Sequence, residues 1–263
     1  MKFSIVTAFL IIISYSLTSC STTPTGRSQL TFMPEGQMSK MGDQSFAQMQ
    51  KSQKVSKDPY LNRKINCIAK RIVENMENGS FEQWDVKVFD DKAVNAFALP
   101  GKNIGVYTGL IKAAENNAQI AAVIGHEVGH VIANHGNERV SQNLLVQGGL
   151  LAADIALNTG NEGKDRLILA SLGLASQVGV LLPFSRRHES EADQIGLELM
   201  AKAGFDPQAA VSFWEVMSKQ SGQQPPELLS THPAHSSRIE NLKSHMKKAR
   251  KIYSANADKK DCP

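Results

Sequence analysis

The chain has 263 residues, of which 41% are hydrophobic, 21% are charged and 6% are aromatic, and its formal net charge at pH 7 is +4. This is the composition of an ordinary globular protein that can bury a core, and the length suits one domain with a tether or tail. Lysine and arginine are spread along the chain and form no basic block interleaved with aromatic residues, which argues against a nucleic-acid partner.

The first residues carry the features of a secretory signal. Lys2 precedes an apolar run from residue 3 to residue 13, and small residues follow up to Cys20. We expect residues 1–19 to be a signal peptide rather than a membrane-spanning helix. The segment Leu17-Thr18-Ser19-Cys20 also resembles a bacterial lipobox, in which Cys20 becomes the lipidated first residue of the mature protein. The alternative is an ordinary signal peptide with an incidental cysteine.

The lipobox resemblance implies a location as well. Residue 21 is serine rather than aspartate, which by the sorting rule of bacteria with this pattern directs a lipoprotein to the outer membrane. We expect the chain to lie at the periplasmic face of that membrane, tethered through Cys20. Residues 20–50 would form the tether and an N-terminal segment, and the Ser, Thr, Pro and Gly residues of 21–35 predict a flexible chain there.

The next segments alternate between helix and strand signals. A helix is predicted to begin at Asp58-Pro59, because apolar residues then recur at three- and four-residue spacing up to Val73. Three strands are predicted at residues 84–89, 94–99 and 104–108. The turn signal at residues 100–103 joins the second and third strands as a hairpin.

A strongly periodic helix is predicted over residues 115–134, with Gly136 as its C-cap residue. Residues 167–185 carry no charge, which raises the question of a membrane span. Ser171, Gly173 and Pro183 dilute the hydrophobicity, so we expect a buried or membrane-touching helix instead of a spanning one. Further helices are predicted at residues 189–203 and 209–218 and from residue 236 onward.

Two further cysteines, Cys67 and Cys262, lie far apart in the sequence. In the oxidising periplasm they could form a disulfide that ties the C-terminal tail, residues 251–263, to the body of the protein. The alternative is a buried Cys67 and a free thiol in the tail.

The central helix contains the pattern His-Glu-x-x-His at His126, Glu127 and His130. Residues four apart lie on one face of a helix, so the two imidazoles can bind a single metal ion while Glu127 reaches a water molecule beside them. The pattern is short, and the alternative is two surface histidines on an amphipathic helix. Its position inside a strongly periodic helix favours a metal site.

Catalytic zinc requires a third protein ligand and an open position. His135 lies five residues after His130 and points away from the ligand face, so it is a poor candidate. Glu189 and Asp193 are four apart on a predicted helix, so one could bind the metal while the other accepts a hydrogen bond from a ligating histidine. On spacing alone, Glu191 or His188 could replace Glu189.

Three motifs together are specific enough to indicate a family. The His126-Glu127-x-x-His130 pattern, the Glu189-x-x-Ala192-Asp193 pattern and Ser230-Thr231-His232-Pro233 resemble the HtpX/LoiP-type zinc peptidases of metallopeptidase family forty-eight, in their periplasmic lipoprotein branch. The resemblance covers roughly residues 50–250 and implies a peptidase domain at 51–250. It also implies a predominantly helical α+β fold of the small gluzincin type, with an active-site helix and a short sheet or hairpin.

The resemblance assigns roles to these residues. His126, His130 and Glu189 would bind one Zn²⁺ per chain, and Asp193 would accept a hydrogen bond from a ligating histidine. Glu127 would act as general base toward a zinc-activated water. His232 would face the transition state or, as in some relatives, occupy the fourth metal position in a latent state. The alternative for His232 is a loop histidine without a catalytic role.

Peptidases of this kind bind substrate as an added strand along a sheet edge. We assign that edge to Asn95, Ala96 and Phe97, although Phe97 would also suit the core. The expected function is hydrolysis of misfolded or unassembled envelope proteins, with possible envelope partner proteins. The alternatives are a periplasmic chaperone or assembly factor with a latent zinc site, and a structural zinc module. Glu127 argues against the last, because structural sites are closed by four protein ligands.

Overall fold

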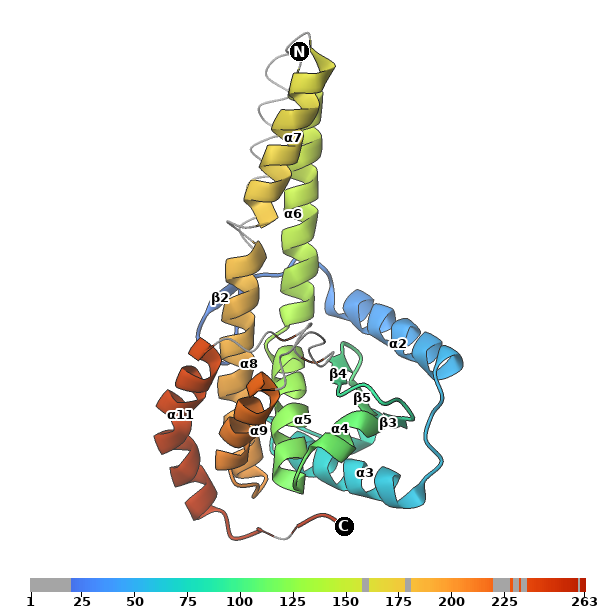
Figure 1. Ribbon diagram of the computed structural model, residues 1–263, viewed down its shortest axis with the longest axis vertical. Coiled ribbons are helices and arrows are strands. Elements are labelled where there is room, and N and C mark those ends of the chain that lie inside the picture. Colours follow the sequence, from blue (N-terminus) through green and yellow to red (C-terminus); the bar gives the residue numbers. More distant parts are fainter. Residues whose placement is uncertain are drawn as a thin grey trace. The chain divides into compact units, whose positions relative to one another are not determined.

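The computed structural model describes residues 20–157, 161–177, 181–219, 228, 232, 236–259 and 261–263. The predicted signal peptide at residues 1–19 lies outside the described residues. The chain divides into two compact units. The larger unit comprises residues 35–133 and 186–263, and the smaller unit comprises residues 1–34 and 134–185. The division places residues 134–185 of the predicted peptidase domain in the smaller unit. The described part of the chain is mostly helical with short sheets, which confirms the predicted fold class (Figure 1).

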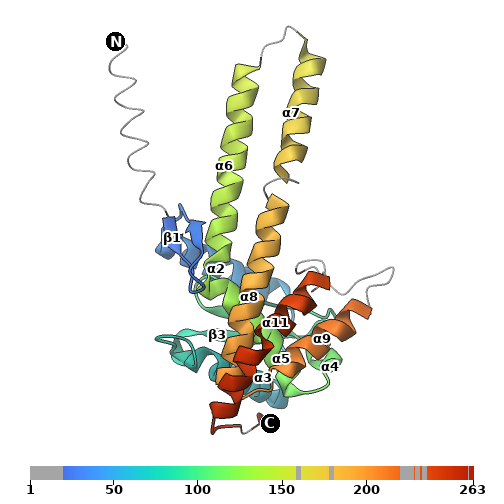
Figure 2. The same cartoon turned by 90° about the vertical axis from the view of Figure 1, so that its left-hand side faces the viewer.

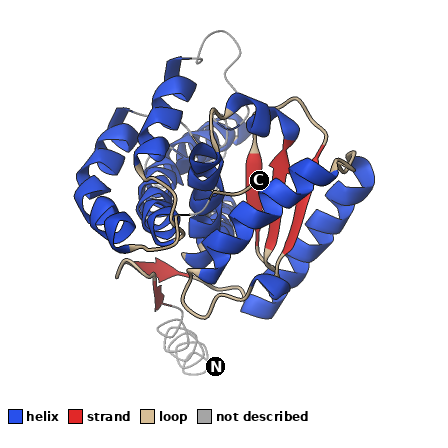
Figure 3. Cartoon of the chain, turned by 90° about the horizontal axis from the view of Figure 1, so that it is seen from below, coloured by secondary structure: helices blue, strands red, loops and turns tan. Residues whose placement is uncertain are grey.

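The sheet of the larger unit has three strands, in the order β3-β5-β4 (red strands in Figure 3). β3 (Asp85–Phe89) runs parallel to β5 (Asn103–Tyr107), and β4 (Ala96–Leu99) runs antiparallel to β5. The predicted hairpin of the second and third strands is therefore confirmed. Gly101 and Lys102 both adopt positive φ in the connecting turn, where glycine is the residue that costs least.

The two faces of this sheet contact different helices. Alternate residues such as Val88 and Ile104 face the main core, to which α3 (Pro59–Glu74) and α5 (Asn117–Ile132) contribute. The opposite face carries Phe89, Phe97 and Tyr107, which pack around Phe46 of α2 (Glu35–Ser52). The sheet is thus a middle layer between α2 and the helices of the core.

The remaining helices of the larger unit complete the core. They are α4 (Thr108–Ala113), the larger-unit part of α8 (Leu182–Lys202), α9 (Gln208–Lys219) and α11 (Ser236–Ala255), with a short 3-10 turn η1 (Phe81–Gln83) before β3. α3 begins where the sequence predicted, and Asp58 caps it by accepting hydrogen bonds from the backbone of Tyr60 and Leu61.

The smaller unit contains a two-stranded sheet and a helical hairpin. β1 (Cys20–Thr22) pairs antiparallel with β2 (Ser28–Leu30), and α6 (His135–Ala156) packs against α7 (Glu162–Ser176) (Figure 2). The prediction of a flexible tether at residues 21–35 was wrong. Arg27 forms two hydrogen bonds to the buried carboxylate of Glu138, at 2.9 and 2.7 Å, and these fix the β1–β2 segment to α6.

The predicted end of the central helix also needs correction. Asn134, not Gly136, adopts the left-handed conformation after α5, with φ 53°, and His135 already begins α6. Asparagine tolerates this conformation because its short polar side chain is compatible with positive φ. Among the described residues, no helix is both long enough and apolar enough to cross a bilayer.

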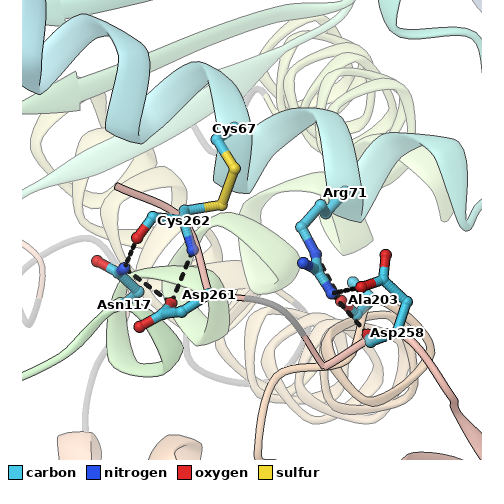
Figure 4. The surroundings of a disulfide bond; sticks show 7 residues. All are labelled: Cys67, Arg71, Asn117, Ala203, Asp258, Asp261 and Cys262. Atoms are coloured by element: carbon cyan, nitrogen blue, oxygen red, sulfur yellow. Dashed lines mark hydrogen bonds and ion pairs between the residues drawn. A yellow bond between two sulfur atoms is a disulfide. The ribbon is translucent and has the colours of Figure 1, made fainter.

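A disulfide joins Cys67 of α3 to Cys262, 195 residues later (Figure 4). The tail beside it makes further bonds. The side chain of Asn117, the first residue of α5, donates to the Cys262 carbonyl and to Asp261, both at 2.8 Å. Arg71 donates to the Asp258 carbonyl at 2.7 Å. The C-terminal tail therefore ties α3 to the start of α5.

Removing this disulfide should destabilise the protein. Cys67→Ser combined with Cys262→Ser should lower the free energy of unfolding by about 2–5 kcal/mol. Without the crosslink between residues 195 apart, the unfolded chain has more conformational entropy and is therefore more stable. Denaturant unfolding under oxidising conditions would measure the difference. Wild-type protein under reducing conditions is the matched control and should resemble the double variant. An unchanged unfolding midpoint in the double variant would contradict the prediction.

Candidate metal centre

The site is built where α5 and α8 cross within the larger unit. A Cβ atom on Gly129 would lie 2.9 Å from the carbonyl oxygen of Ala192, and one on Gly196 would lie 2.6 Å from the backbone nitrogen of His126. Glycine at these positions allows the two helix backbones to touch. As a result, the histidines of α5 face the carboxylates of α8.

Two histidines and one glutamate converge at this crossing. His126 Nε2 lies 3.1 Å from His130 Nε2 and 3.3 Å from Glu189 Oε2. His130 Nε2 lies 3.5 Å from the other carboxylate oxygen of Glu189. All three side chains are buried. The structure thus brings together the three residues that the sequence motifs assigned to the metal.

His232 joins the same group. Its Nδ1 lies 3.2 Å from His126 Nε2 and 3.0 Å from Glu189 Oε2, and its backbone N–H donates to the Leu228 carbonyl at 2.8 Å. The residues adjacent to it in the Ser230–Pro233 motif lie outside the described residues. The ligand atoms of the four residues lie within 4.8 Å of one another.

These distances fit a zinc ion. A tetrahedral ion bound at about 2.0–2.1 Å by nitrogen and oxygen places neighbouring ligand atoms about 3.3 Å apart. The measured separations of 3.0–3.5 Å scatter around that value. Three imidazoles and a carboxylate are also ligand types that zinc prefers. The residues present can therefore hold the ion.

A second layer of contacts orients His126. Its Nδ1 lies 2.9 Å from Asp193 Oδ1, so an N–H at Nδ1 donates to that carboxylate and leaves Nε2 directed at the metal position. Asp193 in turn accepts two hydrogen bonds from the guanidinium of Arg238, at 2.6 and 2.8 Å. Arg238 also lies 3.2 Å from Glu189 Oε2 and stacks on the ring of Trp214, 3.9 Å from its centroid.

Arg238 and Trp214 were not identified as site residues from the sequence. Arg238 forms its ion pairs with the two site carboxylates of α8, Glu189 and Asp193. Nothing in the sequence around Arg238 indicates that its side chain is buried against carboxylates of another helix.

The electrostatics of the site reflect these pairings. Burial and the neighbouring guanidinium lower the pKa of His126, but hydrogen bonds to Asp193 and Glu189 outweigh them and raise it to about 9. Burial raises the pKa of Glu189, yet hydrogen bonds from His126 and His232 bring it well below its usual range. Burial likewise raises the pKa of Asp193, but the charge and hydrogen bonds of Arg238 outweigh burial, so this pKa is lowered. The carboxylates are thus held in their charged form.

Glu127 is buried next to the metal group. Its Oε1 accepts no hydrogen bond from the described residues and lies 3.4 Å from His232 Nε2. The competing candidates are placed elsewhere. Glu191 and His188 are buried but do not belong to the converging group, and His135 lies in the smaller unit.

The predicted substrate edge lies at the border of the sheet. β4 is an edge strand in the order β3-β5-β4 and contacts α5, the helix that carries the motif. Ala96 is buried against the main core, and Phe97 packs with the aromatic cluster around Phe46. Phe97 therefore packs its side chain while its backbone belongs to an edge strand, and substrate binding at this edge stays a prediction.

Comparison with known proteins identifies the family. Residues 59–246 match the model of peptidase family M48. The chain belongs to this family. Members use zinc, and the buried group of His126, His130, Glu189 and His232 can bind it. The family resemblance inferred from the three motifs is confirmed.

Several curated relatives are similar to this M48 chain. The mitochondrial metalloendopeptidase OMA1 of Arabidopsis thaliana is 35% identical over 210 residues, which is 76% of this chain and 39% of the relative. OMA1 of Schizosaccharomyces pombe is 34% identical over 187 residues, 70% of this chain and 53% of the relative. The β-barrel assembly-enhancing protease of Escherichia coli K12 is 29% identical over 222 residues, 82% and 45% of the two chains. The chain spans about half the length of these relatives or less.

Replacing Glu189 tests the ligand set. Glu189→Ala should reduce the zinc content from about one ion per chain to a small fraction, because the group loses its anionic ligand and keeps only the neutral imidazoles of His126, His130 and His232. Elemental analysis after dialysis would measure it. Glu191→Ala, which changes a buried carboxylate on the same helix outside the group, is the matched control and should keep its zinc. Full occupancy in Glu189→Ala would exclude Glu189 as a ligand.

Replacing Arg238 tests the support behind the ligands. Arg238→Met should lower the free energy of unfolding of the metal-free protein by about 3–5 kcal/mol, because it leaves the buried Asp193 carboxylate without its ion-pair partner. Asp193→Asn in the same chain should recover part of this loss, since an amide is less costly to bury than an unpaired charge. Denaturant unfolding in chelator would measure both. If the losses in free energy of unfolding caused by Arg238→Met and Asp193→Asn simply added in the double variant, the ion pair between Arg238 and Asp193 would be contradicted.

Proposed function

We propose that this M48 chain is a zinc endopeptidase that hydrolyses misfolded or unassembled proteins of the bacterial cell envelope. The observation that carries the proposal is the carboxylate of Glu127, buried beside four converging metal donors. A site that only stabilised the fold would not need a further carboxylate at that place.

Each residue of the site has a distinct task in peptide hydrolysis. When bound, zinc polarises the scissile carbonyl and acidifies water. Glu127 takes the proton from the attacking water and delivers it to the leaving amine. Asp193 holds His126 in the tautomer that directs Nε2 inward, and Arg238 keeps Asp193 ionised and in place. The peptide would pair with the edge strand β4, and backbone pairing suits substrates of varied sequence.

His232 must move before a substrate carbonyl can approach. Its Nδ1 lies within hydrogen-bonding distance of both His126 and Glu189, so with zinc bound it would occupy the position that a catalytic zinc site keeps open. Once displaced, its imidazole would stay near the reacting carbonyl and could donate a hydrogen bond to the developing negative charge.

The envelope assignment rests on two further supports. Cys20 stands where a lipobox would place the acylated first residue, which would tether the protein to the periplasmic face of the outer membrane. One of the relatives in Escherichia coli is named a β-barrel assembly-enhancing protease, which suggests substrates and partners among envelope proteins.

A second candidate function has a specific observation in its favour. With His232 in the group, four protein side chains converge, as in closed zinc sites. A chain with this arrangement could act as a chaperone or assembly factor with a latent metal site.

One substitution distinguishes the two. Glu127→Gln should keep zinc and fold while the rate of casein cleavage falls about 100- to 10,000-fold, because the general base is lost. Glu74→Gln, an exposed glutamate on α3, is the control and should cleave normally. Chelator should abolish wild-type cleavage. If wild-type protein does not cleave casein but suppresses its aggregation, and Glu127→Gln does so equally, the chaperone function is favoured.

A further inference from the structure

Leu228 connects the metal centre to the sheet through its backbone. Its N–H donates a hydrogen bond to the Val94 carbonyl at 3.1 Å, and its own carbonyl accepts one from the His232 N–H at 2.8 Å. The Leu228 side chain is 0% exposed and belongs to the main core. The residue whose backbone holds His232 is therefore itself attached to the chain that leads into β4.

The Val94 carbonyl lies on the free side of the edge strand. Asn95 extends the pairing of β4 with β5, because its carbonyl accepts a hydrogen bond from the Tyr107 N–H at 3.1 Å. Carbonyl groups of neighbouring residues in a strand point to opposite sides, so that of Val94 points away from β5. By the same alternation, the backbone N–H and carbonyl of Ala96 face this free side. Leu228 thus bonds to the edge along which a substrate strand would add.

His232 is held from a second side as well, but by a different kind of contact. Arg238 donates a hydrogen bond to the His232 carbonyl at 3.2 Å, and Asp193 and Trp214 fix the guanidinium. These partners are side chains of the metal centre itself. The contact of Leu228 with Val94 joins two backbone groups, and the backbone N–H of a peptide can replace one of them.

The buried side chain of Leu228 adds a requirement for any strand that replaces it. Withdrawing a fully buried leucine leaves a cavity, and the free energy lost increases with the volume of that cavity. A large apolar side chain from the incoming strand would fill the space and recover this loss. A polar side chain would have to give up its hydrogen bonds to water there. The edge therefore favours strands with an apolar residue at this point.

We propose that Leu228 is a positioning residue that keeps His232 at the metal, and that a substrate strand displaces it. The substrate backbone takes over the Val94 carbonyl, and an apolar substrate side chain takes the place of the leucine. Because Leu228 then no longer holds His232, strand binding also frees the open position of the metal. The inference rests on the proposed endopeptidase function and adds a substrate class to it, which is extended segments with a large apolar residue.

Peptide binding tests the displacement without cleavage. The protein carries Glu127→Gln, and the probe is a short, capped, fluorescent peptide of alternating threonine and leucine, measured by anisotropy. Leu228→Ala should tighten binding of this peptide about tenfold, because the competing leucine is lost and more of the protein has a free edge. A peptide with serine in place of leucine should bind more weakly to both proteins and gain less from Leu228→Ala.

Zinc affinity tests whether Leu228 acts through His232. Competition with a chelator should show zinc binding about tenfold weaker in Leu228→Ala, because His232 is no longer held at the metal. In a chain that already carries His232→Ala, the same change should leave zinc affinity as it was. Equal weakening in both chains would show that Leu228 only supports the fold, and would overturn the positioning role.

The matched control is Leu110→Ala on α4, which also removes a leucine side chain that is 0% exposed. It should change neither peptide nor zinc affinity. Circular dichroism should show that all variants fold, and Leu228→Val, with a smaller loss of volume, should shift both affinities less and in the same directions.

An unchanged or weaker affinity of Leu228→Ala for the leucine peptide would overturn the displacement. So would equal gains for the leucine and serine peptides. Casein cleavage by the wild-type protein is a separate measurement. Its absence would overturn the endopeptidase function, while the affinity shifts would still show a strand that displaces Leu228.

Discussion

The close contact between the backbones of α5 and α8 is the constraint on which the metal centre depends. Any side chain at Gly129 or Gly196 would collide with the facing backbone. At this separation a histidine side chain from one helix and a carboxylate from the other reach the same point, as the 3.3 Å between His126 and Glu189 shows. A larger residue would separate the helices, and the donor atoms would no longer surround one ion. The glycine inside the His-Glu-x-Gly-His segment is therefore part of the site although it binds nothing.

Charge balance explains why such a site requires a cation. Glu127, Glu189 and Asp193 place three carboxylates in the buried region, and Arg238 is the guanidinium that faces them. When all are ionised, these four groups sum to two negative charges, which a divalent ion would neutralise. Without the ion, burial lowers the pKa of His126, but hydrogen bonds to Asp193 and Glu189 outweigh burial and raise it to about 9. The hydrogen bonds from Arg238 and His126 lower the pKa of Asp193, so that carboxylate stays available to orient its histidine.

The parts of this site that sequence reasoning found are the local ones. Two histidines four residues apart on one helix are defined by the helical repeat alone, and so are Glu189 and Asp193. The choice of Glu189 over Glu191 or His188 required the family resemblance, because nothing local links residue 189 to residue 126. Arg238 was missed as a site residue because the site side chains that it contacts, Asp193, Glu189 and His126, lie 45 to 112 residues away. The same limit explains the wrong prediction of a flexible tether. Residues 21–35 have a loop-like composition, and what orders them is Glu138, 111 residues beyond Arg27.

The C-terminal tail of the larger unit fixes the start of α5, the helix that carries the His-Glu-x-x-His motif. α5 begins at Asn117, and the Asn116 side chain caps it by accepting a hydrogen bond from the Gln119 backbone. The Asn117 side chain donates hydrogen bonds to Asp261 and to the Cys262 carbonyl. Cys262 is in turn bonded to α3, which packs against α5 and β3. The first turn of α5 is therefore held by the Asn116 cap, by the C-terminal tail and, through the disulfide, by α3. His130 lies in the last turn of the same helix. A helix whose start cannot fray keeps the angular position of its later residues, and Asp193 and Arg238 then only have to set the orientation of the imidazole ring. Rigidity from the tail and orientation from α8 and α11 are thus separate contributions to the same metal geometry.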